Sequence, residues 1–128
     1  MKRKNIETLL AWLDALRRGD REAIADALAA DIVWQGVRDD LVCHGRGEVA
    51  DGFGAAMGEA FDVEALELIG AERHAILHAR LPETVEVAGV LFDEGVYNVF
   101  AIADGTITRI DDHTRRAAAL AAAGLPAS

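Results

Sequence analysis

Three titratable residues in the second half of the chain are of the types that acid–base catalysis uses: Asp112, His74 and His78. Alternation along the last expected strand puts Asp112 on the same face as Ile110. Burial in apolar surroundings disfavours the charged carboxylate and raises its pKa, which suits a general acid. The alternative is a solvated pair, Asp111-Asp112, at a strand end before a helix N-terminus, where negative charge is favourable.

The two histidines lie four residues apart on one expected strand, with Ile76 between them on the same face. The residues of the other face are apolar, so burial alone turns His74 and His78 away from the core. A histidine close to Asp112 would instead form an acid–base pair, in which the carboxylate fixes the tautomer of the ring. Simple solvation is the other alternative. No metal-ligand spacing is present, so we expect no metal site.

Three helices are expected before these strands. Asn5 is suited to cap a first helix with apolar residues on one face, and Asp20 a second helix that continues to Leu28. A third helix follows Gly45-Arg46-Gly47 and turns Phe53 inward.

From Val63 onward the apolar period changes from that of a helix to two. Short connections, of which Asp104-Gly105 is a strong hairpin signal, predict antiparallel pairing. Thr114 is suited to cap a short final helix that ends near Gly124 and Pro126. The layout is α+β, with helices on one face of a curved sheet. The expected strands are Ile32–Trp34, Val63–Ile69, Glu72–Leu81, Thr84–Phe92, Val96–Ala103 and Thr106–Thr114.

Length and charge narrow the function classes. A chain of 128 residues predicts one domain over residues 1–128. A net charge of −9 argues against broad binding to nucleic acid, which needs clusters of Lys and Arg. The single Cys43 excludes an internal disulfide and a cysteine-based zinc site, and no apolar run is long enough to cross a membrane. We therefore expect a cytoplasmic protein.

Three segments carry a resemblance to a known family: Ala29–Trp34, Gly45–Val49, and Gly105-Thr106-Ile107 through Asp112. Together with the order of elements, they resemble the nuclear transport factor 2-like superfamily, and within it the SnoaL-like branch. The resemblance implies a cone-shaped, curved antiparallel sheet of about six strands, packed on three N-terminal helices and followed by a short C-terminal helix. It also implies a homodimer. The superfamily includes ketosteroid isomerases, polyketide cyclases, limonene epoxide hydrolases, dehydratases and non-catalytic modules, so the fold does not decide the function.

The resemblance also suggests places for individual residues. Asp112 matches a pocket aspartate of the cyclase-like and epoxide-hydrolase-like branches, and Trp34 matches an aromatic pocket position. Alignment with the epoxide-hydrolase branch puts His74 near the pocket arginine and Ile76 near a second pocket aspartate, which conflicts with the burial argument. Gly36 stands where that branch has a polar residue that positions water. The ketosteroid isomerase base falls at about Gln35.

The sequence therefore predicts a pocket for a small apolar molecule, with cofactor-free isomerisation, cyclisation, dehydration or hydrolysis. Asp112 would be the acid or base, and His78 or His74 its partner. The alternative is a non-catalytic binding or dimerisation module whose cone is a ligand cup or is filled by side chains. The residues expected to contact the substrate are Trp34, Ile76, Ile110, Phe53 and Phe100.

Overall fold

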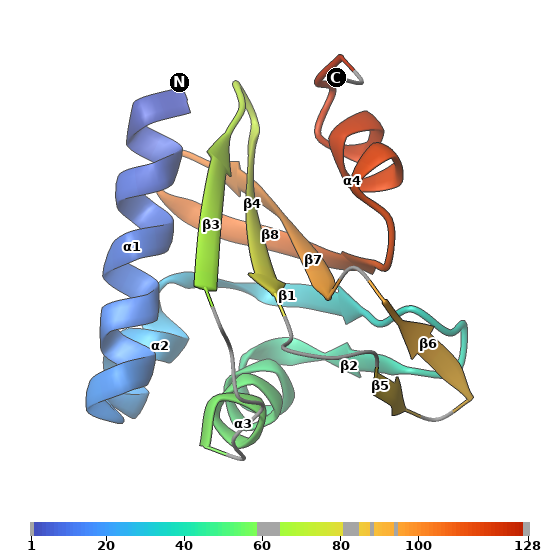
Figure 1. The fold of residues 1–128 in the computed structure, drawn as a ribbon. Helices are drawn as coiled ribbons and strands as arrows, with labels where there is room; N and C mark the ends of the chain where they lie inside the picture. The colour runs from blue at the N-terminus through green and yellow to red at the C-terminus, as the bar shows by residue number, and fades with distance from the viewer. Residues whose placement is uncertain (1, 59–64, 81–84, 88, 94, 127–128) are drawn as a thin grey trace.

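The computed structural model describes residues 2–58, 65–80, 85–87, 89–93 and 95–126. These residues form four helices and eight strands (Figure 1). The elements are, in order, α1 (Lys2–Arg18), α2 (Arg21–Asp26), β1 (Leu28–Gln35), β2 (Val42–His44), α3 (Gly45–Gly58), β3 (Ala65–Gly70), β4 (His74–Arg80), β5 (Val85–Val87), β6 (Val90–Phe92), β7 (Val96–Ala103), β8 (Thr106–His113) and α4 (Arg116–Ala122).

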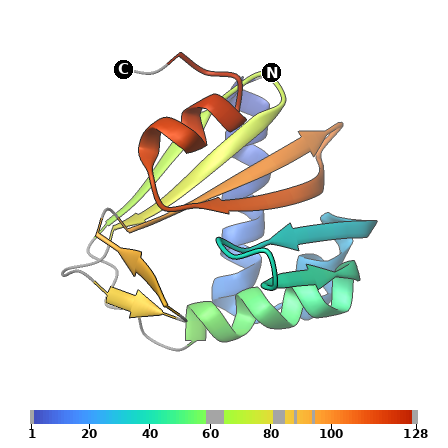
Figure 2. The same ribbon diagram turned by 90° about the vertical axis from the view of Figure 1, so that its right-hand side faces the viewer.

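Six strands form the main sheet in the order β2-β1-β8-β7-β4-β3. Neighbouring strands pair antiparallel except β1 and β8, which are parallel and far apart in the sequence. The sheet is curved and does not close into a barrel. Figure 2 shows that the hairpin of β5 and β6 stands apart from it. The α+β class, the curved sheet and the six-strand count predicted from the sequence are confirmed.

The two faces of the sheet carry separate apolar clusters. The inner face packs against α1, α2 and α3, around fully buried residues such as Leu9, Phe100 and Ile110. The outer face packs against α4 through a smaller cluster that includes Ile76 and Tyr97. Figure 1 shows α1 and α4 on opposite sides of the sheet. A residue of β4, β7 or β8 is therefore assigned to the inner or the outer face by the cluster that its side chain joins.

Helix starts differ from the sequence prediction at two of three places. Asp20 does cap α2, since its side chain accepts a hydrogen bond from the backbone N–H of Ala23. Asn5 is not a cap: it lies inside α1, is buried, and donates to the backbone carbonyls of Ala71 and Glu72, which ties the helix to the turn between β3 and β4. α4 begins after Thr114, at Arg116, and no side chain caps it.

Two strand predictions are wrong in a physically simple way. Residues 42–44 form edge strand β2, which was not predicted. A segment of three residues next to a turn-rich loop is too short to show an alternating apolar pattern. The stretch expected as one strand over Thr84–Phe92 is instead the hairpin of β5 and β6. Gly89, with a φ of +80°, lies at its turn. Val63, Leu81 and Thr84, at ends of expected strands, lie outside the described residues.

A register shift between β7 and β8 brings Ile107 to the same face as Ile110. Strict alternation separates Ile107 from Ile110, yet both are fully buried in the inner cluster. The pairing of β7 with β8 shifts between Ala101 and Ile102, and this irregularity brings both isoleucines to the inner face. The alternation from Ile110 to Asp112 is unaffected.

Among the described helices, none combines the length and the apolar character needed to cross a bilayer.

Candidate functional site

Asp112 lies on the inner face of β8, beyond the buried Ile110. Asn98 of β7 is its direct cross-strand neighbour, and Trp34 of β1 pairs with Ile110, so all of these side chains share the inner face. The indole Nε1 of Trp34 donates to Asp112 Oδ1 at 2.9 Å, and the amide Nδ2 of Asn98 donates to the same oxygen at 2.5 Å. The two strands that flank β8, β1 and β7, therefore each supply one hydrogen-bond donor to the same carboxyl oxygen.

The second carboxyl oxygen of Asp112 is left for other partners. Both hydrogen bonds that the described residues make with the carboxyl group fall on Oδ1, and none falls on Oδ2. Two donors on one oxygen fix the plane of the carboxyl group and favour placing a proton on the other oxygen. Oδ2 is thus the oxygen on which a proton is favoured when the carboxyl group is neutral.

Burial raises the pKa of Asp112 to about 6. The hydrogen bonds from Trp34 and Asn98 oppose this change by stabilising the carboxylate, and the negative charge of Asp111 adds to it. The balance leaves a carboxyl group that changes protonation state near neutral pH. The sequence predicted this direction for an aspartate on an apolar face.

The aromatic residues beneath the carboxyl group form a packed floor. The ring centroids of Trp34 and Phe53 lie 4.1 Å apart, and those of Phe53 and Phe100 lie 5.9 Å apart. Phe53 is 4% exposed, and Phe100 and Ile110 are fully buried, whereas Trp34 is only partly buried. These four residues were predicted to contact a substrate. Only the side chain of Trp34 is partly exposed to solvent, and the other three are buried and pack in the core around the indole.

Close packing at Gly52 and Cys43 fixes the Trp34 ring. A Cβ at Gly52 would lie 2.7 Å from Cζ3 of Trp34, so only glycine lets α3 approach the indole this closely. Cys43 pairs with Trp34 across β2 and β1. Burial raises the pKa of the Cys43 thiol, and the negative charges of Glu48 and Asp112 raise it further. The thiol is therefore protonated at neutral pH and is not an activated nucleophile.

His74, Ile76 and His78 lie on the outer face of β4, opposite Asp112. His78 stacks on Tyr97 with ring centroids 4.0 Å apart, and its Nδ1 lies 3.2 Å from Oε1 of Glu67. Ile76 is fully buried in the outer cluster. The structure does not bring either histidine to Asp112, so the expected acid–base pair is not formed and Ile76 does not line the inner face.

The burial argument placed these three residues correctly, and the alignment did not. The alternate residues of β4, Ala75 and Leu77, are apolar and join the inner cluster. Turning His74 and His78 inward would move these apolar side chains away from the core. The free-energy cost of that exposure fixes which face of the strand is buried.

Asn98 is the site residue that the sequence prediction did not single out. Tyr97 and Asn98 are adjacent on β7 and point to opposite faces: Tyr97 joins the outer cluster while Asn98 reaches Asp112. An amide at an inward position of an otherwise apolar strand was the available signal, because a buried amide needs a partner. In the described part of the chain, no group of three His, Cys, Asp or Glu residues is placed to hold a metal ion.

A family model described as a SnoaL-like domain matches residues 9–110. No curated protein matches the chain. The fold is similar to that of an NTF2-like protein from Burkholderia xenovorans, with a TM-score of 0.65, 16% identity, and coverage of 96% of this chain and 97% of the other. It is also similar to a LEH-like epoxide hydrolase from M. tuberculosis (TM-score 0.61, 21% identity, coverage 87% and 82%). A candidate ketosteroid isomerase from Kribbella flavida gives a TM-score of 0.59 at 16% identity, with coverage of 87% and 77%. At these identities the solved structures support the fold alone.

Proposed function

The chain belongs to the SnoaL-like domain family, and from that premise we propose that it is an enzyme that performs cofactor-free acid–base chemistry on a small, largely apolar molecule. Asp112 is the proposed proton donor and acceptor. The reaction class is an isomerisation, cyclisation, dehydration or hydrolysis, in which one proton moves to or from the substrate.

One observation carries this proposal: the half-buried carboxyl group of Asp112 has its pKa raised to about 6 by desolvation and accepts two hydrogen bonds from described residues, both on Oδ1. A group whose pKa lies near the working pH is available in both protonation states, which acid–base catalysis requires. A carboxylate that only increases solubility is usually exposed to water, and its pKa stays near the ordinary value. The desolvated Asp112, with donors from a neutral tryptophan and a neutral asparagine, differs from such a group.

The geometry supports a simple division of roles. Trp34 and Asn98 orient the carboxyl group through Oδ1, and Oδ2 gives the proton to the substrate or removes it. The partly exposed ring of Trp34 offers an apolar wall next to the carboxyl group. A neutral, apolar substrate fits these surroundings, because an anion would meet the carboxylate and a strongly polar molecule would lose hydration without gaining partners.

The test is a paired substitution. A thermal-shift screen of terpenoid, steroid and polyketide-like compounds first identifies ligands, which are then assayed for conversion. Asp112→Asn is expected to abolish conversion while keeping the hydrogen bonds to Oδ1. Asp111→Asn is the matched control, since Asp111 faces outward and pairs with Arg109 at 2.9 Å. Conversion that survives Asp112→Asn, or that both variants lose equally, would contradict the proposal.

A non-catalytic binding or dimerisation module is the second candidate function. The packed floor of Phe53, Phe100 and Ile110 favours it, because these side chains fill the middle of the inner face. This candidate predicts ligands that bind without being converted, and an affinity that Asp112→Asn leaves unchanged.

A homodimer and a cytoplasmic location belong to the proposal as well. Large apolar side chains at Leu41, Val42 and Leu66 are 40%, 36% and 49% exposed, and a second copy of the chain would cover such groups. Analytical ultracentrifugation at micromolar concentration tests the dimer, with a monomer as the contrary result. Cell fractionation tests the location.

A further inference from the structure

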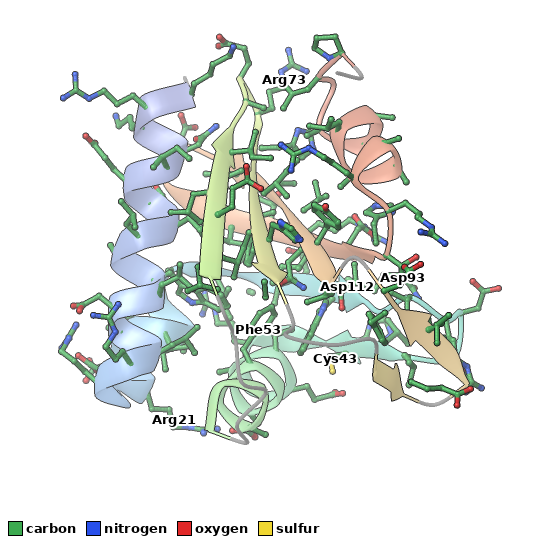
Figure 3. The ribbon with its side chains drawn as sticks, in the orientation of Figure 1. Arg21, Cys43, Phe53, Arg73, Asp93 and Asp112 are labelled. Atoms are coloured by element: carbon green, nitrogen blue, oxygen red, sulfur yellow. The ribbon has the colours of Figure 1, made fainter. Side chains whose placement is uncertain are left out.

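A cleft lies away from Asp112, at the end of the molecule near both termini (Figure 1). It has a volume of about 460 Å³ and lies between the first turn of α1, the turn from β3 to β4, and the segment that follows α4. Figure 3 shows Arg73 at this turn, beside the C-terminal segment. The volume falls within the range of about 300–1,000 Å³ typical of small-molecule sites.

Three nitrogen-bearing side chains line this cleft: Lys2, Arg73 and His74. None of them makes a hydrogen bond or an ion pair with any other described residue. Arg73 is unusual in this respect. Of the described arginine side chains, only Arg17 shares its lack of a partner, and those with a partner are Arg3, Arg18, Arg21, Arg38, Arg46, Arg109, Arg115 and Arg116.

An unpaired arginine is unexpected in this chain because carboxylates are plentiful. The sequence has 22 Asp and Glu residues against 13 Lys and Arg. Three side chains of positive or titratable character line one hollow, and none of them has an acceptor among the described residues, which suits an anion site. Glu72 is the carboxylate that the described lining contains, and it reduces the positive charge there without cancelling it.

The rest of the lining is apolar. Leu125 and Pro126 supply carbon surface beside the charged groups, and the buried Ala71 lies beneath the cleft. Inorganic anions would leave this surface unused, whereas an organic anion with a hydrocarbon part would cover it. The two kinds of lining therefore define one ligand chemistry: a single negative head group on an apolar chain.

We propose that this cleft binds a small amphiphilic anion, such as a medium-chain carboxylate, with its head group on Arg73, Lys2 and His74 and its chain on Leu125 and Pro126. The site is independent of the proposed reaction at Asp112, because His74 lies on the outer face of the sheet and Asp112 on the inner face. His74, which the sequence analysis considered as a catalytic partner, serves ligand binding here.

The test uses octanoate as the probe, with calorimetry for affinity and NMR of the histidine rings for location. Octanoate is expected to bind with a dissociation constant of about 1 mM or below, as its size allows. The neutral analogue n-octanol and the short anion acetate are each expected to bind at least about tenfold more weakly, since each lacks one of the two features.

Paired variants locate the charge recognition. Arg73→Gln is expected to weaken octanoate binding about tenfold, the loss typical of one charge-assisted hydrogen bond. Arg17→Gln removes an equally unpaired arginine at the other end of α1 and is expected to change nothing. Glu72→Gln is expected to strengthen binding about twofold, as for one solvent-screened charge. The side chain of Arg73 is exposed and makes no hydrogen bond with the described part of the chain, so its variant is expected to fold like the wild type.

The His74 ring reports on the site directly. Burial lowers the pKa of His74, Asp111 acts to raise it, and the positive charge of Arg73 lowers it further. A bound carboxylate beside Lys2 and Arg73 is expected to raise the pKa of His74 while leaving the ring signals of His78 in place. The proposal is overturned if octanol binds as well as octanoate, if the Arg73 and Arg17 variants behave alike, or if the His74 signals do not move.

Discussion

Replacing Asp112 by asparagine is expected to stabilise the protein, and more so as the pH rises. The folded state holds the pKa of Asp112 at about 6, against 3.8 for an unperturbed group. That difference corresponds to about 3 kcal/mol between the two protonation states. Asparagine has nearly the same shape, keeps an Oδ1 that can accept from Trp34 and Asn98, and carries no charge to bury.

The sign follows from proton binding. Between pH 4 and 6 the folded protein holds the Asp112 proton more tightly than the unfolded chain, so the free energy of unfolding falls as the pH rises. Relative to the fully protonated state, burying the carboxylate costs about 1.6 kcal/mol at pH 5 and about 2.9 kcal/mol at pH 7. The stability gained by Asp112→Asn should therefore grow by about 1.3 kcal/mol between these two pH values.

Urea denaturation at pH 5, 6 and 7 measures this difference, with Asp111→Asn as the control. The control removes one neighbouring carboxylate from the outer face but keeps Asp112, so its stability should still fall as the pH rises, with a slightly smaller slope because Asp111 contributes to raising the pKa of Asp112. A gain from Asp112→Asn that is the same at pH 5 and pH 7 would refute the reasoning, because the carboxyl group would then not be desolvated.

Three further predictions concern the surroundings of the site. Gly52→Ala is expected to destabilise the fold, since the added Cβ would lie 2.7 Å from the Trp34 ring. Gly54→Ala, in the same helix with nothing within 4 Å of the added Cβ, should stabilise it by up to about 1 kcal/mol in thermal or urea unfolding. Trp34→Phe removes a donor that lowers the pKa of Asp112, so that pKa should rise further above 6 in an NMR titration. An unchanged value would mean that the indole does not reach the carboxyl group. Asn5→Ala leaves two carbonyls at the turn between β3 and β4 without their donor and should cost about 1–3 kcal/mol in urea unfolding. A neutral result would show that water replaces the amide.

Local pattern predicted the elements that have a clear period. The hairpin at Asp104-Gly105 is present, with φ of +50° and +78°, and strands β7 and β8 begin where the alternation begins. Pattern failed where tertiary pairing decides. Edge strand β2 exists because it pairs with β1, and the inward turn of Ile107 results from a register shift. Both depend on pairing with a neighbouring strand, which the alternation within one segment does not reveal.

The candidate site divides in the same way. The alternation from Ile110 to Asp112 gave the correct face for Asp112, and the apolar residues of β4 gave the correct outward face for His74 and His78. Asn98 was not singled out, because its role depends on pairing opposite Asp112 on a neighbouring strand. The burial of Phe53 and Phe100 depends on how closely α3 approaches the sheet, which a single sequence does not contain.

The most direct test of the central claim is the pKa of Asp112, measured by NMR titration of its carboxyl carbon in the wild-type protein. The structure predicts a midpoint at about 6, with the titrating signal absent in Asp112→Asn. A midpoint near the ordinary value of about 3.9 would contradict the claim, because Asp112 would then be a solvated surface carboxylate with no proton to give near neutral pH.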